Sequence, residues 1–297
     1  MSEPRREVPS GGARIAGAPI SWGVCEVPGW GHQLAPDRVL TEMRELGLAA
    51  TEFGPDGFLP ADPGARAALL MAHDLRAVGG FVPVVLHDPA YDPVPEVERA
   101  VAAFGAGDTL VLAAATGRDG YDERPRLDET GWATLLGNLD RLAARAADRG
   151  VRATLHPHVG TIVERADEVD RVLAGSQIPL CLDTGHLFVG GADPSALAAA
   201  AAERIAHTHL KDVDVALAER VRGGELSYSE AVRDGMYRPL GAGDIDIAGV
   251  VRTLAAKGYD GWYVLEQDTM LAAAPAPGAG PYDDVRASIA YLEKVIP

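Results

Sequence analysis

Histidine is the residue type whose placement most clearly predicts chemistry in this sequence. Five of the eight histidines fall in one stretch, where strand-like runs end in the polar segments LHPHVGT, CLDTGH and HTHLKD, and a later run ends in VLEQD. Each of these segments offers a group that can bind a metal ion. The candidate ligands are His156 or His158, Asp183, His209 and Glu266.

Side chains at the ends of neighbouring strands can converge on one ion, because adjacent strands lie about 4.8 Å apart. Imidazole and carboxylate ligands suit Mn²⁺, Co²⁺, Fe²⁺, Zn²⁺ or Mg²⁺, and the lack of thiolate ligands argues against a structural zinc site. Taken singly, Asp183 could cap the following turn and Glu266 could pair with an arginine. Several such groups at one end of a core are more simply explained by a shared cation, because unpaired buried charges are costly.

The chain that positions these residues alternates short β-branched runs with Ala/Leu/Arg-rich stretches. The predicted strands are Arg14–Trp22, Ala50–Gly54, Gly80–Leu86, Thr109–Ala115, Arg152–His158, Leu180–Asp183, Ile205–Leu210 and Trp262–Glu266. The predicted helices are Pro36–Leu46, Pro63–Val78, Val94–Phe104, Glu129–Arg149, Ala166–Ala174, Pro194–Glu203, Ile247–Lys257 and Tyr282–Lys294. Eight such alternations favour a (β/α)8 TIM barrel, with working residues at the C-terminal ends of its strands. A doubly wound sheet is less suitable, because no G-x-G-x-x-G or P-loop motif follows the first strand.

One domain is expected over residues 13–297, after a disordered tail at residues 1–12 that is rich in Pro, Gly and Ser. The connection Val213–Gly243 is longer than the others and partly helical around Ser229–Arg233. Because it follows the seventh strand, it is expected at the catalytic face, as a lid, a subunit contact or both.

Composition narrows the classes of partner. The formal net charge of −16 makes nucleic acid and anionic membrane poor partners. The sequence has no apolar run long enough for a transmembrane helix and no secretory signal. With only Cys25 and Cys181, a disulfide framework is not expected, and a cytoplasmic location is the simplest interpretation.

Several segments resemble a known family. DTGH, HTHLKD and GYDGWYVLEQD are similar to the hallmark strands of xylose-isomerase-like barrels. A closer resemblance is to the inosose dehydratase (2-keto-myo-inositol dehydratase) family, through PISWG, ATEFG, HPHVGT and the connection containing SYSEAVRDGM. The resemblance covers the chain from about Ile15 to Tyr291, and the last two of these segments are its more specific part.

The resemblance implies a metal-dependent lyase that removes water from a cyclic keto-polyol through an enolate. It places the metal, Mn²⁺ or Co²⁺ by preference, on Asp183, His209 and Glu266. His156 stands where most relatives carry a Glu ligand, and His158 is the alternative to His156 as the metal ligand from this strand. Glu164, His158 and Lys211 are candidate bases, and His186 or His209 is the candidate acid. The expected substrate-binding residues are Glu52, Trp22, His87 and Arg238, and a buried salt bridge is the alternative for Glu52.

Three other functions share this barrel. A sugar isomerase or epimerase would use the same metal-stabilised enolate, so the ligands alone do not separate it from a dehydratase. A non-catalytic sugar-binding barrel predicts missing site groups, whereas the groups are retained here. A nuclease conflicts with the acidic charge. A small polyol or keto-sugar is the expected partner, and a homo-oligomer, dimer or tetramer, is typical of such barrels.

Overall fold

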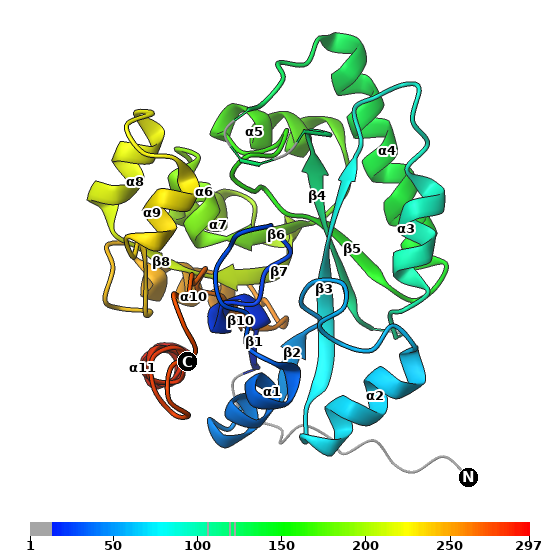
Figure 1. Ribbon diagram of the computed structural model, residues 1–297. Helices are drawn as coiled ribbons and strands as arrows, with labels where there is room; N and C mark the ends of the chain where they lie inside the picture. The colour runs from blue at the N-terminus through cyan, green and yellow to red at the C-terminus, as the bar shows by residue number, and fades with distance from the viewer. Residues whose placement is uncertain (1–13, 106, 119, 122) are drawn as a thin grey trace.

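A computed structural model describes residues 14–297 apart from residues 106, 119 and 122. The expected tail at residues 1–12 lies outside this described part. Within it, eight parallel strands close into a barrel in the order β1-β10-β7-β6-β5-β4-β3-β2. Their bounds are β1 Ile15–Gly17, β2 Ala50–Glu52, β3 Arg76–Val85, β4 Thr109–Ala115, β5 Arg152–Leu155, β6 Leu180–Asp183, β7 Ile205–Leu210 and β10 Tyr263–Leu265. The predicted TIM barrel is confirmed (Figure 1).

Helices alternate with the strands and cover the barrel (Figure 1). They are α1 Pro36–Glu45, α2 Pro63–Ala72, α3 Val94–Val101, α4 Glu129–Ala147, α5 Ala166–Gly175, α6 Thr184–Val189, α7 Pro194–Ala200, α10 Ile247–Ala256 and α11 Pro281–Val295. Local sequence sets many of their starts. Asp62, Asp128 and Asp193 accept bonds from the first free amides of α2, α4 and α7, which is how an N-cap stabilises a helix.

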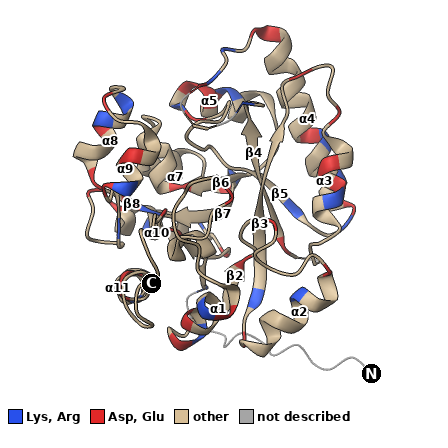
Figure 2. Cartoon of the chain, in the orientation of Figure 1, with Lys and Arg blue, Asp and Glu red and all other residues tan. Residues whose placement is uncertain are grey.

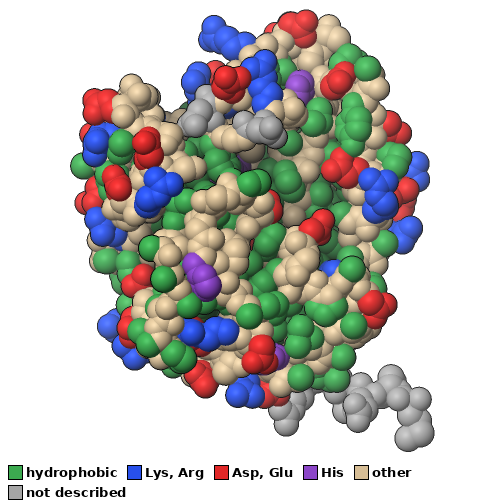
Figure 3. Space-filling model, viewed as in Figure 1, with side chains coloured by type: hydrophobic (Ala, Val, Ile, Leu, Met, Phe, Trp, Pro, Cys, Tyr) green, Lys and Arg blue, Asp and Glu red, His purple; other side chains and the backbone are tan. Residues whose placement is uncertain are grey.

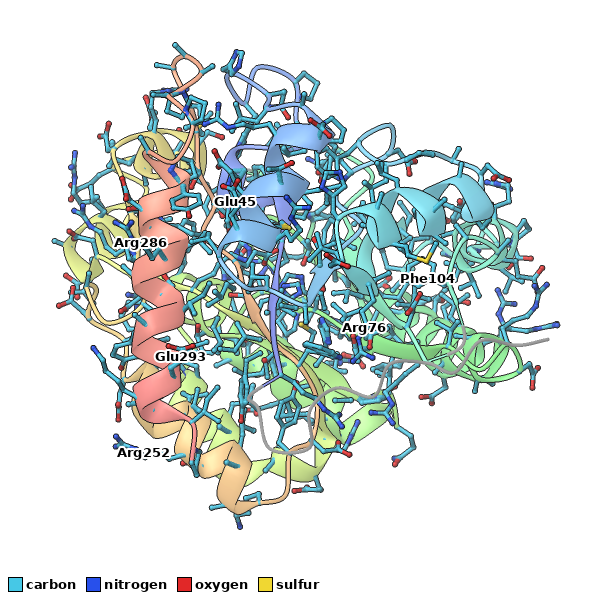
Figure 4. The ribbon with its side chains drawn as sticks, turned by 90° about the horizontal axis from the view of Figure 1, so that it is seen from below. Glu45, Arg76, Phe104, Arg252, Arg286 and Glu293 are labelled. Carbon is cyan, nitrogen blue, oxygen red and sulfur yellow. The ribbon has the colours of Figure 1, made fainter. Side chains whose placement is uncertain are left out.

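Charged side chains lie mainly on the helices and loops, and the strands are largely free of them (Figure 2). The last helix, α11, runs along the outside of the molecule and carries Arg286 and Glu293 there (Figure 4). Its buried face, which includes Val285 and Leu292, packs on the main core. Among the described residues, no helix combines the length and apolar character needed to cross a membrane.

Three predicted boundaries are wrong for local reasons. The first strand ends at Gly17, and Pro19–Trp22 form the 3-10 helix η1, which begins at a proline. Helix α2 ends at Ala72 rather than Val78, since Asp74 adopts a left-handed φ of 54° and turns the chain. As a result β3 starts at Arg76, earlier than the predicted Gly80.

The long connection after β7 is an ordered unit. It contains the short strands β8 (Asp212–Val213) and β9 (Tyr237–Arg238) and the helices α8 (Val215–Arg222) and α9 (Tyr228–Arg233). The buried carboxylate of Asp212 accepts hydrogen bonds from the amides of Val213, Gly241, Gly243 and Ile245, at 2.8 to 3.0 Å. One side chain therefore ties together both ends of the connection.

Candidate active site

A cavity of about 790 Å³ opens at the C-terminal ends of the strands. On the face in Figure 3, hydrophobic side chains gather in the middle and charged ones lie mostly toward the edge. The polar residues of the cavity wall include Glu52, His156, His158, His186, Lys211, Glu266 and Asp268. Four of the five histidines of the clustered stretch are less accessible than 2%, and His158 is partly buried.

Strand register brings three of the predicted metal ligands together. Asp183, the last residue of β6, pairs with His209 on β7, which in turn pairs with Val264 on β10. Glu266 lies two residues beyond Val264 and so faces the same side. Asp183, His209 and Glu266 each offer a ligand atom, and these atoms lie within 4.8 Å of one another.

The free ring nitrogens support a cation at this place. Nδ1 of His209 lies 2.8 Å from Oε2 of Glu266 and 3.6 Å from Oδ2 of Asp183, yet it makes no hydrogen bond within the described chain. Nε2 of His156 is 3.2 Å from the same Asp183 oxygen. Electron-rich atoms of Asp183, His209 and Glu266 thus face a small volume, and this donor set fits a divalent ion.

Lys211 neutralises these carboxylates. Its ammonium donates to Asp183 at 2.7 Å, contacts Glu266, and lies 3.5 Å from Asp268. Burial disfavours the charge on Lys211, but the three carboxylates outweigh it and raise its pKa well above the usual value. This environment does not suit the predicted role of Lys211 as a base, because the nitrogen keeps its proton.

The pKa values of the Glu266 and Asp183 carboxylates shift in the opposite direction, below their usual values. Burial opposes ionisation of Glu266, but the neighbouring His209 and Lys211 prevail and lower its pKa to about 2. In the same way, the charge of Lys211 overcomes burial and holds the pKa of Asp183 well below its usual value. Both groups are therefore ionised, as metal ligands must be.

His158 and His186 lie against each other, with ring centroids 3.7 Å apart. Nδ1 of His158 donates to the carbonyl of Val159 at 2.7 Å, so its Nε2 carries the lone pair. Burial lowers the pKa of His158 to about 3 and that of His186 well below its usual value. Both rings are neutral, which does not suit the acid role predicted for His186.

Asp268 is a cavity residue that sequence analysis missed. It is 8% exposed, accepts a hydrogen bond from the hydroxyl of Tyr228, and lies 3.9 Å from Nε2 of His186. Tyr237, whose hydroxyl is 3.0 Å from that of Tyr228, completes the group. Burial raises the pKa of Asp268 to about 6. Its position two residues after Glu266 was the available signal.

Glu52 was predicted to bind substrate hydroxyls or to form a buried salt bridge. It lines the cavity, but its Oε1 accepts from Nε2 of His207 at 2.8 Å and from Nε2 of His209 at 2.9 Å. Burial raises the pKa of Glu52, but the two imidazoles reverse the shift and bring it below the usual value. The buried salt bridge is therefore the alternative present here.

Two predicted site residues are held away from the cavity by other partners. Glu164 accepts from the amide of Gly160 at 2.7 Å and pairs with Arg124 at 3.2 Å. Trp22 is fully buried, because η1 turns its indole toward α1, where it donates to Glu42 at 2.8 Å. Neither lines the cavity.

The other two predicted substrate-binding residues, Arg238 and His87, also lie outside the cavity wall. Arg238 pairs with Asp214 at 3.0 Å inside the connection after β7, so its charge is already compensated. His87 follows the long strand β3, which carries it beyond the cavity wall, and burial lowers its pKa. The substrate-binding roles expected for Trp22, His87 and Arg238 and the base role of Glu164 are not supported by this geometry.

Comparison with known proteins places the chain in a family. The family model of xylose isomerase-like TIM barrels matches residues 40–295. The chain is 34% identical over 266 residues to the rhizopine catabolism protein MocC of Rhizobium meliloti, covering 86% of this chain and 81% of the relative. It is 30% identical over 303 residues to an inosose dehydratase of Geobacillus kaustophilus (strain HTA426), covering 95% and 94%.

Among solved structures, the IOLI protein with a binding zinc atom superposes with a TM-score of 0.64 at 13% identity, covering 95% of this chain and 98% of that one. At this identity the likeness concerns the fold. The sequence relatives go further, because their similarity spans nearly the whole length of both chains. The chain belongs to the inosose dehydratase family of xylose isomerase-like TIM barrels.

Proposed function

We propose that this enzyme is a hydro-lyase that removes water from inosose, or from a closely related cyclic keto-polyol, with the help of a divalent metal ion. The observation that carries the proposal is the convergence of Asp183, His209 and Glu266 at the mouth of the barrel. The relative named inosose dehydratase supports the choice of reaction.

The ion would be held by Asp183, His209 and Glu266, with His156 as the fourth ligand. When bound, it would supply Lewis-acid polarisation of the substrate carbonyl. We favour Mn²⁺ or Co²⁺, because the donors combine carboxylates with imidazoles. The zinc named for the structurally similar IOLI protein makes Zn²⁺ the first ion to compare with them.

The chemistry begins at the carbon next to the carbonyl. Loss of its proton leaves an enolate. The hydroxyl on the next carbon of the ring then leaves as water, which gives a hydroxy-enone, the enol form of a dione. We assign the proton acceptance to Nε2 of His158, because its Nδ1 proton is held by Val159 and its ring lines the cavity. The fixed charge of Lys211 would stabilise the enolate oxygen.

The leaving hydroxyl needs a proton to depart as water. We assign this proton to Asp268 in place of His186, because Asp268 lines the same cavity and accepts a hydrogen bond from the Tyr228 hydroxyl.

The two cysteines, Cys25 and Cys181, are both unpaired, which supports the proposal of a reducing, cytoplasmic setting.

The test is to purify the protein, measure its bound metal, and incubate it with 2-keto-myo-inositol beside a panel of ketoses. Dehydration produces a dione with new ultraviolet absorbance, whereas epimerisation does not. Absorbance that grows only with inosose and only with metal present supports the proposal. Conversion of a ketose to its epimer without absorbance would replace the dehydratase by the epimerase.

A further inference from the structure

A hydrogen-bonded bridge crosses the interior of the barrel from β2 to β7. Glu52, at the end of β2, is 3% exposed, and His207 and His209 both point to its Oε1 from β7. The two histidines are two residues apart and share the inner face of their strand. Glu52 joins a deeper histidine to the one proposed to bind the metal.

The bridge decides which nitrogen of His209 remains for an ion. Because the carboxylate of Glu52 accepts at Nε2, this nitrogen carries a proton. Nδ1 is then the one ring nitrogen left to bind, and it is the atom that faces Glu266 at 2.8 Å and Asp183 at 3.6 Å. It also has no hydrogen-bond partner among the described residues.

We propose that Glu52 is a positioning residue that fixes the proton and the ring orientation of His209, so that Nδ1 is presented to the metal, and that His207 anchors Glu52 in place. This positioning role rests on the metal site of the proposed function. A carboxylate behind a ligating imidazole orients the ring and raises its basicity.

Glu52, His207 and His209 also form a group of three potential ligand atoms within 4.8 Å. Here the close approaches are hydrogen bonds of 2.8 and 2.9 Å between ring nitrogens and one carboxylate oxygen. These pairs satisfy one another without a cation, whereas Nδ1 of His209 faces carboxylates alone. We therefore place the ion at Nδ1 of His209, on the side of the ring that faces the barrel mouth. Glu52 holds the opposite nitrogen, Nε2, by its hydrogen bond.

The test is Glu52→Gln, with the affinity for Co²⁺ and for Mn²⁺ measured by titration calorimetry on metal-free protein. Affinity should fall by about 10- to 100-fold. The visible spectrum of the Co²⁺-loaded variant should also change, because reorienting His209 alters the ligand field. The matched control is Glu42→Gln, which removes another buried carboxylate, on α1 and outside the cavity wall, where it is bonded to Trp22 and Arg38. It should lower stability but leave affinity and spectrum unchanged.

A second pair of variants covers the case in which Glu52→Gln does not fold. His207→Phe removes the anchor and should weaken Co²⁺ binding, and His207→Gln, which restores a donor to Glu52, should recover most of it. Unchanged affinity and spectrum in Glu52→Gln or in His207→Phe would overturn the positioning role while leaving the proposed function standing. A wild-type protein that binds no divalent ion would instead overturn the metal site itself.

Discussion

The ammonium nitrogen of Lys211 lies 2.7 Å from Oδ2 of Asp183. The same oxygen faces Nε2 of His156 at 3.2 Å and Nδ1 of His209 at 3.6 Å. One oxygen atom thus borders both the lysine charge and the nitrogens proposed to hold the metal. We therefore expect Lys211 and a divalent ion to compete for the same negative charge.

Lys211→Met tests this competition. Without the ammonium, Asp183 and Glu266 keep their full charge for the ion, so affinity for Mn²⁺ should rise by about tenfold. The metal-free variant should lose stability on the order of 3 kcal/mol, because two buried carboxylates lose their partner, and added metal should restore it. Turnover of inosose should fall by about a hundredfold or more, since the charge beside the enolate is gone.

Calorimetry, thermal unfolding with and without metal, and the absorbance assay measure the three effects. The exposed Lys257 at the end of α10 gives the matched control, Lys257→Met, which should leave all three unchanged. Weaker metal binding in Lys211→Met would contradict the competition and would make the lysine a helper of the metal site.

Glu266→Gln should abolish both metal binding and turnover, because the amide neither neutralises the ion nor replaces the carboxylate as a strong ligand. Asp268→Asn is its counterpart two residues away. It should keep metal affinity within about threefold, since its closest charged neighbour is the ammonium of Lys211 at 3.5 Å, while turnover falls by about a hundredfold. Metal analysis of both purified variants separates the two residues. Full activity in Glu266→Gln would refute the site assignment.

The alternation of apolar runs and helical stretches was sufficient to predict the barrel. The bounds of β4, β6 and β7 agree with prediction because their buried runs are flanked by clear breaks. The helix α6 was missed, because a six-residue segment that includes Gly185 has little helical pattern of its own. It forms because Asp183 caps it, accepting from the amide of His186 at 2.8 Å.

Contacts between distant residues set the limit of the sequence prediction. Strand-end position alone brought Asp183, His209 and Glu266 together correctly. It could not distinguish Glu52, which reaches His209 across 157 positions of sequence, from a residue that faces substrate. Trp22 was misplaced because a 3-10 turn, rather than continued strand, set the direction of its indole. In both cases the partner lies on another element, which periodicity does not identify.

Cys25 lines the cavity, so its reactivity tests how dry this part of the wall is. Burial, followed by the nearby charge of Glu26, raises the pKa of the Cys25 thiol well above its usual value. The thiolate is thus depleted at pH 8, and iodoacetamide should label Cys25 in the folded protein at least about tenfold more slowly than in the unfolded chain. The raised pKa favours the folded state below pH 9, and this contribution is lost as the pH rises further. Mass spectrometry of time-resolved labelling measures the rate, and equal rates in folded and unfolded protein would contradict the burial.

Asp212 should control the order of the connection that carries Tyr228 and Tyr237 to the cavity. Its carboxylate accepts four backbone amides, and Asp212→Asn would turn an amide donor toward some of them. We expect a loss on the order of 3 kcal/mol in the free energy of unfolding, faster proteolysis within residues 213–243, and a lower turnover, because the hydroxyl of Tyr228 no longer supports Asp268. Asp234→Asn, an exposed aspartate of the same connection, is the matched control and should change none of these. Denaturant titration and limited proteolysis measure the effects. A variant with wild-type stability and protease resistance would show that the connection is held by its apolar contacts, Val232 and Met236 among them, rather than by the Asp212 carboxylate.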